Sequence, residues 1–535
     1  MYKTIMRRAG IGILIVLLSA SGPTAQPAPQ YDILITGGQV VDGSGAPMRR
    51  ADVAIKDGRI AAIGLLAPAT ARETIRAAGL IVAPGFIDVH THADDLARHP
   101  KAENFVRMGV TSIVAGNCGT SALDVGEALA RIRETGAAVN FATLIGHNTV
   151  REAVMGTADR APSIPELAKM QSLVWRAMTD GAVGFSTGLQ YVPGTYAAQP
   201  EIMELARTAS AAGGLYASHM RNEGTALEAA VLETLRVGEA TGARVQISHL
   251  KVDSPSRWGD SARALALINA ARARGLTVEE DQYAYTAASS TLGIRFPSWA
   301  LEGGQDRMAE RLNDPPTWAR IKTEMALLLR ERGLSDLSFA VVATAPADAS
   351  LAGLSMKQIA VKRSGLDTAE AQFEAARALM LTGGASMVYH LMSDEDVDRI
   401  MKDPHVAIAS DSSLLTPGDG APHPRGYGNN ARVLGEYARE RHVVTIEEAV
   451  RKMTSLPAGQ FHFAGRGSIK TGYAADVVLF DPLLVRDRAT FEQPHAYPSG
   501  IPYVIVNGVP VVVNGEQTGA RPGTILSPAA TSPAR

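Results

Sequence analysis

Between about residues 80 and 460 the chain repeats one pattern of apolar and polar positions. A short apolar run ends on a polar residue, an amphipathic stretch follows, and glycine precedes the next run, as at Gly213-Gly214, Gly242 and Gly275. Short apolar runs are typical of buried strands, and amphipathic stretches that end on glycine are typical of helices. The pattern therefore predicts a repeated strand–helix unit, in which Ser163 and Glu166 mark one capped helix start.

Eight apolar runs end at points where parallel strands would end. Eight parallel strands that alternate with helices form a TIM-type barrel, so we expect an α/β protein with a (β/α)8 barrel over residues 83–463. A ninth run, 386–390, falls in the long interval before the last strand, and we assign an insertion to about residues 290–385. The expected strands end near Asp88, Ala115, Leu144, Gly184, Ser218, Ser248, Asp281 and Ser410.

Two segments outside the repeat, 31–82 and 464–520, alternate apolar and polar positions as strands do. Within the second segment, residues 504–515 predict a hairpin with Asn-Gly turns. We expect the two segments to pair in one small composite β-sandwich domain. Residues 521–535 are rich in Pro, Ser and Ala and are expected to be disordered.

The first 26 residues have the layout of a secretory signal. Lys3, Arg7 and Arg8 precede the apolar run 11–18, and small residues follow it. This run is shorter than the roughly 20 apolar residues of a bilayer span. We therefore expect a cleaved signal at 1–26, no stable membrane span afterwards, and a periplasmic or secreted protein.

The composition is that of a globular protein, with 46% apolar and 20% charged residues among 535. A formal net charge of −2 provides no basic field for nucleic acid, so a small polar substrate fits better. Cys118 is the only cysteine, which excludes a disulfide within the chain. An exported protein would carry this thiol into an oxidising compartment.

Metal-binding side chains follow five of the expected strands, and the active sites of such barrels lie where the strands end. His90 and His92 follow the first strand, and their spacing lets both imidazoles point to one side of an extended chain. Cys118 follows the second strand, and a thiolate binds zinc strongly and can bridge two ions. Each residue alone is more often a surface or hydrogen-bonded group. The remaining candidates are His219, His249 and Asp411.

Distinct motifs surround these candidates. Pro-Gly-Phe-Ile-Asp-Val-His-Thr-His-Ala-Asp occupies 84–94, Gly-Asn-Cys-Gly occupies 116–119, and strand four, 181–187, contains no lysine. Further motifs are Ser-His-Met-Arg-Asn-Glu at 218–223, Ser-His-Leu-Lys at 248–251, Ser-Asp at 410–411 and Ala-Ala-Asp-Val-Val-Leu-Phe-Asp at 474–481. Together they resemble the amidohydrolase superfamily and, more narrowly, its N-acyl-D-amino-acid deacylases (D-aminoacylases). Many members of the superfamily use a lysine-derived carbamate from strand four, which the cysteine replaces in these deacylases.

The resemblance implies zinc-dependent hydrolysis of the amide bond of N-acyl-D-amino acids, which releases a carboxylate and a free D-amino acid. It implies a tight zinc on Cys118, His219 and His249. It also implies a second, weaker position on His90 and His92, with Cys118 bridging.

The resemblance further implies that Asp411 is the acid/base group. Zinc lowers the pKa of bound water to about 7 and polarises a carbonyl. Asp411 would take the proton of the water and pass it to the departing amine. One departure from the family is Leu250, which stands where a second histidine is usual; the matching ligand is His249, so zinc binding should survive.

A free α-carboxylate on the substrate needs cations and hydroxyl groups near the mouth of the barrel. Lys251 follows the candidate ligand His249 by two residues. The resemblance implies that Arg425 and Tyr191 grip the carboxylate and that Tyr283 helps to bind the amide or the carboxylate. The D configuration of the substrate rests on the resemblance alone.

Three other functions fit the same residues. A zinc dipeptidase acting on peptides with a C-terminal D-residue would use the same catalytic groups, and activity on dipeptides against acetyl-amino acids separates the two. A cyclic-amide hydrolase is a further alternative, although Lys251 and Arg425 favour an open carboxylate. An exported binding protein on a degenerate barrel would not need the complete ligand set, and its zinc content distinguishes it.

Overall fold

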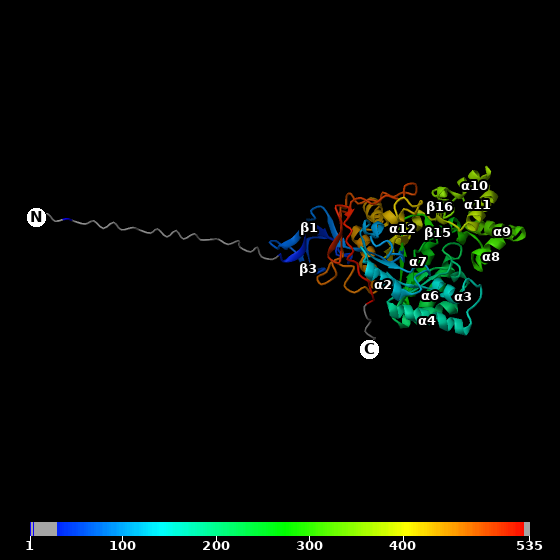
Figure 1. Ribbon diagram of the computed structural model, residues 1–535, viewed down its shortest axis with the longest axis horizontal. Coiled ribbons are helices and arrows are strands. Elements are labelled where there is room, and N and C mark those ends of the chain that lie inside the picture. Colours follow the sequence, from blue (N-terminus) through cyan, green and yellow to red (C-terminus); the bar gives the residue numbers. More distant parts are fainter. Residues whose placement is uncertain (2–3, 5–28, 529–535) are drawn as a thin grey trace.

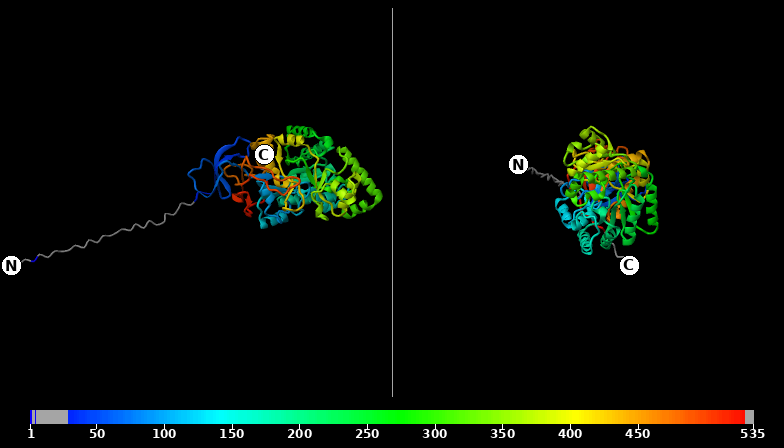
Figure 2. Two further views of the ribbon diagram at one scale, coloured as in Figure 1. Left: turned by 90° about the horizontal axis from the view of Figure 1, so that it is seen from above. Right: turned by 90° about the vertical axis from the view of Figure 1, so that its right-hand side faces the viewer.

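The computed structural model describes residues 1, 4 and 29–528. The predicted signal at 1–26 therefore lies outside the described residues, apart from Met1 and Thr4. Within the described part of the chain, no helix has both the length and the apolar character needed to cross a membrane. The two β-rich terminal segments gather at one end of the molecule, and the insertion forms the other end (Figures 1 and 2).

Parallel strands form the centre of the fold. They are β6 (Phe86–Asp88), β8 (Val110–Ala115), β9 (Asn140–Thr143), β10 (Ile145–Gly146), β11 (Gly184–Gly188), β12 (Leu215–His219), β13 (Val245–Ile247), β14 (Val278–Gln282) and β18 (Val406–Ile408). Each pairs with the next in chain order, except that the chain itself links β9 to β10. The short strands β7 (Thr91–His92) and β19 (Ser412–Ser413) pair in parallel, so the pairing returns to the first strand. Parallel pairing of strands in chain order agrees with the expected α/β fold.

The fourth strand expected from the sequence, which corresponds to β11, differs from the prediction. β11 begins at Gly184, where the sequence pattern predicted its end. The polar residues Ser186 and Thr187 lie inside the strand rather than beyond its end. Thr187 Oγ1 donates a hydrogen bond to Ser218 Oγ of β12 at 3.0 Å. The carboxyl end of β11 therefore lies at Gly188, close to the cavity-lining residue Tyr191.

Helices connect the strands. The longest of them, α4 (Ile164–Asp180), begins with the predicted capping box of Ser163 and Glu166 and ends at Gly181, whose φ is 116°. The others are α1 (Glu103–Val106), α2 (Val125–Thr135), α3 (His147–Met155), α5 (Gln199–Ala211), α6 (Leu227–Thr241), α7 (Ser261–Ala273), α12 (Asp394–Lys402), α13 (Arg425–Arg432), a π-helix (Val433–Glu440), α14 (Ile446–Met453) and α15 (Ser455–Gln460). Helices α4, α5, α6 and α7 contact one another in sequence order.

The insertion has its own secondary structure. Its antiparallel sheet places β17 (Ser386–Tyr389) between β15 (Ala288–Thr291) and β16 (Ala340–Thr344). The segment therefore extends beyond the expected 290–385, because β15 and β17 pair with each other at its two ends. Its helices are α8 (Gly304–Asn313), α9 (Pro315–Glu331), α10 (Met356–Ser364) and α11 (Ala369–Leu381), with short 3-10 turns at Leu292–Arg295, Ser298–Leu301 and Ala349–Leu351.

The two terminal segments share one nine-stranded sheet. Its strands are β1 (Tyr31–Val40), β2 (Arg49–Lys56), β3 (Arg59–Gly64), β4 (Ala71–Arg76), β5 (Ile81–Pro84), β20 (Val477–Phe480), β21 (Tyr503–Val506), β22 (Val509–Val513) and β23 (Glu516–Gln517). The antiparallel pair of β5 and β20 joins the segments. The predicted hairpin is present, since β21 and β22 pair around Asn507-Gly508, where both residues have positive φ.

The expected disordered tail is wrong for its first residues. Phe141 N donates a hydrogen bond to Thr524 O at 2.9 Å, and Leu526 N donates one to Phe141 O at 2.7 Å. Leu526 is only 6% exposed, because it packs with apolar residues of the strands. Residues 529–535 lie outside the described part of the chain.

Candidate metal centre

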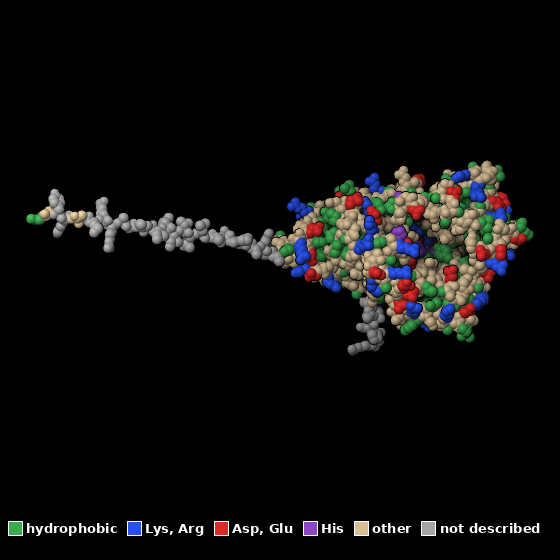
Figure 3. All heavy atoms as spheres, viewed as in Figure 1, with side chains coloured by type: hydrophobic (Ala, Val, Ile, Leu, Met, Phe, Trp, Pro, Cys, Tyr) green, Lys and Arg blue, Asp and Glu red, His purple; other side chains and the backbone are tan. Residues whose placement is uncertain are grey.

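A cavity of about 880 Å³ opens at the carboxyl ends of the parallel strands and extends to the insertion. The surface is hollowed on this side of the molecule, with histidine atoms at the edge of the hollow (Figure 3). Five of the six metal or acid/base residues expected from the sequence line this cavity, and the sixth, His90, is buried in contact with them. The lining residues are His92, Cys118, His219, His249 and Asp411.

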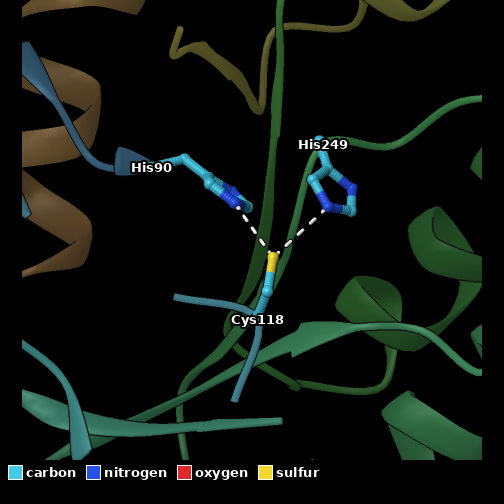
Figure 4. Close-up of side chains that lie close together, drawn as sticks. All are labelled: His90, Cys118 and His249. Atoms are coloured by element: carbon cyan, nitrogen blue, oxygen red, sulfur yellow. Dashed lines mark hydrogen bonds between the residues drawn. The ribbon is translucent and has the colours of Figure 1, made fainter. Parts of the chain in front are cut away.

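The thiol of Cys118 lies at the centre of this cluster. His90 Nε2 is 3.3 Å from its sulfur and His249 Nε2 is 3.5 Å away. Both imidazoles point toward the sulfur (Figure 4). The three donor atoms lie within 4.8 Å of one another, so a single ion could contact all three. Sulfur with imidazole nitrogen is the donor chemistry that zinc prefers.

His90, His92 and Asp411 form a second group of donors within the same distance limit. Asp411 Oδ1 lies 3.1 Å from His92 Nε2 and 3.5 Å from His90 Nε2. Because both groups contain His90, they lie side by side, although one imidazole nitrogen binds only one ion at a time.

His219 belongs to a third group, with Glu223 and His249. Its Nε2 is 3.0 Å from Gln190 Oε1, and its ring centre is 4.5 Å from that of His249. The resemblance implied His219 and His249 as the partners of Cys118, whereas the donor groups place His90 and His249 around the sulfur. All expected ligands nevertheless lie in one continuous cluster.

Three residues of the cluster have left-handed backbone conformations. The φ angle is 54° at Cys118, 34° at His249 and 51° at Asp411. Such conformations cost non-glycine residues about 1 kcal/mol or more each, and they persist where the surroundings hold them. At Cys118 the surroundings are the neighbouring strand β11, which packs closely against the backbone. The approach is so close that a Cβ at Gly188 would overlap the carbonyl oxygen of Cys118.

Burial and the neighbouring charges shift the pKa values of Cys118 and Asp411 in opposite directions. Burial raises the pKa of the Cys118 thiol, but His90 and His249 outweigh it and bring this pKa well below its usual range. Burial also favours the neutral form of Asp411, yet Arg425 and the histidines hold the pKa of its carboxyl well below the usual range. The surroundings therefore favour the anionic forms of both groups, which are the forms that bind a cation.

Three of the four expected substrate-binding residues have contacts within the site: they are Arg425, Tyr191 and Tyr283. Arg425 Nη1 is 2.9 Å from Asp411 Oδ2, and its guanidinium lies 4.5 Å from the centre of the Tyr283 ring. Tyr191 Oη accepts a hydrogen bond from Ser290 at 3.2 Å. All three of these expected residues line the cavity wall.

Lys251 also lines the cavity, but it is not an open cation. It is 4% exposed, and its Nζ lies 2.7 Å from Glu223 Oε2. The negative charge of Glu223 therefore already balances the ammonium, a pairing that the sequence alone did not reveal.

Sequence reasoning missed three residues of the site. Glu223 ends the motif at 218–223, and Asp281 ends a predicted strand, where its Oδ1 lies 3.0 Å from His90 Nδ1. Arg295 has no motif around it; it lines the cavity at 6% exposure, and its Nε has no hydrogen-bond partner. His147, a further buried histidine, lies outside the cluster, and its Nε2 is 2.9 Å from Glu201 Oε1.

Residues 73–512 match the amidohydrolase family. The chain is 38% identical over 521 residues to the D-aminoacylase of Alcaligenes xylosoxydans xylosoxydans, which covers 93% of this chain and 98% of that protein. It is 40% identical to the N-acyl-D-glutamate deacylase of the same organism, with 93% and 96% covered.

A solved structure supports the same relationship. The N-acyl-D-glutamate deacylase of Bordetella bronchiseptica, complexed with zinc and a phosphonate inhibitor, is 37% identical and matches with a TM-score of 0.80, covering 93% of this chain and 99% of that one. The α/β fold is therefore the amidohydrolase fold. The resemblance inferred from the motifs is confirmed, and the chain belongs to the N-acyl-D-amino-acid deacylase (D-aminoacylase) family of the amidohydrolases.

Proposed function

We propose that this protein is a zinc-dependent hydrolase of N-acyl-D-amino acids. Water is added across the amide bond, the acyl group leaves as a carboxylate, and the D-amino acid leaves as the free amine. The observation that carries the proposal is the convergence of Cys118, four histidines and Asp411 at one cavity that also contains Arg425. The names of the relatives support the D configuration.

The donor set fits zinc, because a buried thiolate and imidazole nitrogens surround one point. We assign the tight ion to Cys118, His219 and His249, and the weaker position to His90 and His92 with Cys118 bridging. When bound, zinc supplies a water of lowered pKa and a Lewis acid for the scissile carbonyl. The zinc in the Bordetella relative supports this choice of metal.

Asp411 acts as general base and then as general acid in this proposal. Its Oδ1 faces His92 and His90, and its Oδ2 faces Arg425, so the carboxylate lies between the metal ligands and the substrate side of the cavity. From there it can accept the proton of the attacking water and release it to the amine nitrogen.

The α-carboxylate of the substrate is assigned to Arg425, with the hydroxyl groups of Tyr191 and Tyr283 beside it. A guanidinium binds a carboxylate through two parallel hydrogen bonds. Arg425 already lies over the face of the Tyr283 ring, which fixes its plane.

Arg295 favours an acidic side chain on the substrate. Its guanidinium lies 4.3 Å from the centre of the Tyr389 ring in the cavity wall. Burial lowers the pKa of Arg295, and no carboxylate among the described residues forms an ion pair with it that would offset this cost. A side-chain carboxylate of D-glutamate or D-aspartate would supply the missing partner. The relatives that act on N-acyl-D-glutamate and N-acyl-D-aspartate support this assignment.

The finer architecture and the location belong to the same proposal. The parallel pairings in chain order support a (β/α)8 barrel, and the shared nine-stranded sheet supports a small β-domain. The basic and apolar N-terminal residues support export and a periplasmic or secreted enzyme.

Purified mature protein is expected to hydrolyse N-acetyl-D-amino acids, to leave the matched L series intact, and to contain about one tightly bound zinc per chain. Amine release and metal content are measured on the same sample. Bound zinc with turnover only of dipeptides ending in a D-residue would replace the proposal with the dipeptidase, and turnover only of cyclic amides would replace it with the ring-opening hydrolase. Absence of both zinc and turnover would leave the binding protein.

Replacing Arg295 with methionine is expected to lower kcat/KM for N-acetyl-D-glutamate about 10- to 100-fold, because a charge-assisted hydrogen bond contributes roughly 1.5–3 kcal/mol. N-acetyl-D-leucine provides the internal control, since its side chain has no charge to bind and its kcat/KM should change little. A ratio of the two values that stays at its wild-type level would contradict the assignment of Arg295.

A further inference from the structure

Glu223 is a buried carboxylate between a metal-ligand histidine and the only lysine of the cavity. It lies in the loop after β12, four residues beyond His219, and is 1% exposed. Its Oε1 is 2.9 Å from His249 Nδ1, and its Oε2 is 2.7 Å from Lys251 Nζ. One carboxylate therefore serves two functional side chains at once.

The opposite nitrogen of His249 faces the thiol. His249 Nε2 is 3.5 Å from Cys118 Sγ, on the far side of the ring from Glu223. A neutral imidazole that offers the Nε2 lone pair to a metal carries its proton on Nδ1, and this proton needs an acceptor. Lys251 Nζ is also 2.8 Å from Nδ1, but an ammonium accepts no hydrogen bond. Glu223 is the group in contact that can accept this proton.

Glu223 is better suited to this role than to metal binding. Its Oε2 is 3.8 Å from His219 Nε2, so it belongs geometrically to a donor group with His219 and His249. An ion in that group would lie beside the ammonium of Lys251, whose Nζ is within 2.8 Å of both carboxylate oxygens. Repulsion between the two cations opposes such a site.

We propose that Glu223 is a positioning residue that orients His249 for the metal and at the same time neutralises Lys251. This inference rests on the proposed metal-dependent function. Outer partners of metal-bound histidines fix the orientation of the ring and raise the basicity of the ligand nitrogen. Lys251 consequently lines the cavity without adding net charge to it.

The test separates the two roles by removing Lys251 first. In zinc-loaded protein carrying Lys251→Met, the additional substitution Glu223→Gln leaves no unbalanced ammonium, so the double variant avoids the main threat to folding. We expect zinc to dissociate into a chelator about 10- to 100-fold faster from the double variant than from the Lys251→Met protein. A Glu223 that only balances the lysine predicts equal dissociation rates for these two proteins, and this result would overturn the inference.

Glu201 provides the matched control. It is also a buried glutamate, 4% exposed, and it contacts His147 Nε2 at 2.9 Å and Arg151 Nη1 at 2.6 Å, away from the metal cluster. Glu201→Gln should lower the melting temperature as a structural carboxylate does and leave zinc dissociation unchanged. Zinc loss as fast from Glu201→Gln as from the double variant would mean that general destabilisation is the cause, which also overturns the inference.

The zinc-dissociation test of Glu223 does not depend on which substrate the protein hydrolyses. If the protein holds zinc and the Glu223 effect is present but N-acyl-D-amino acids are not hydrolysed, the proposed function fails and the positioning role stands. If these substrates are hydrolysed and zinc dissociation is indifferent to Glu223, the positioning role fails and the function stands.

Discussion

Replacing Asp411 with asparagine is expected to lower kcat by about 10²- to 10⁴-fold, the usual contribution of a general acid–base group. Asparagine has nearly the same shape but cannot take a proton from water or return one to the amine. The tight zinc should remain, because its proposed ligands, Cys118, His219 and His249, are untouched. Kinetics on N-acetyl-D-amino acids and metal content of the same preparation provide the measurement.

A buried aspartate with a purely structural role serves as the control for that experiment. Asp396 is 1% exposed, and its Oδ2 accepts a hydrogen bond from Gly259 N at 2.9 Å outside the cavity. Asp396→Asn should lower the melting temperature and change kcat little. Turnover of the Asp411→Asn protein within about threefold of wild type would remove Asp411 from the proton transfer.

Replacing Cys118 with serine is expected to abolish tight zinc binding and with it the activity. The sulfur lies between His90 Nε2 and His249 Nε2, so it is the metal donor next to both imidazoles. A serine hydroxyl stays protonated at neutral pH and is a far weaker zinc ligand than a thiolate. The loss of affinity should exceed the roughly 10- to 100-fold that the removal of an outer partner costs.

Two measurements check the Cys118 prediction. Zinc content after dialysis should fall from about one ion per chain to near zero in the Cys118→Ser protein. In the wild-type protein the thiol should react with a thiol reagent only after a chelator has removed the metal, and Cys118 is the only cysteine that can respond. Full zinc retention by Cys118→Ser, or a thiol that reacts equally in both states, would exclude the sulfur as a ligand.

The correction at Lys251 changes how the cavity recognises a carboxylate. The sequence placed a cation two residues after His249, and the structure places that cation in contact with Glu223. Arg425 is likewise paired, with Asp411. Arg295, by contrast, is a cavity cation that contacts no carboxylate within the described residues. This contrast is the reason for expecting an acidic substrate.

The sequence by itself determined the parts of the protein that follow from local patterns. The capping box at Ser163 and Glu166 and the Asn507-Gly508 turn depend on neighbours a few residues away, and both are present. The positions of His90, Cys118 and Asp411 were also predictable, because parallel strands bring their carboxyl ends together whatever the details of packing.

The tertiary structure alone decided which groups touch. His90 and Asp281 are 191 residues apart and meet because the fold brings the carboxyl ends of β6 and β14 to the same cluster. Arg295 reaches the cavity because the insertion folds back over it, and Leu526 is ordered because Phe141 offers it a strand edge. None of these contacts leaves a periodicity or a motif in the chain, since each depends on long-range register and closure rather than on local conformation.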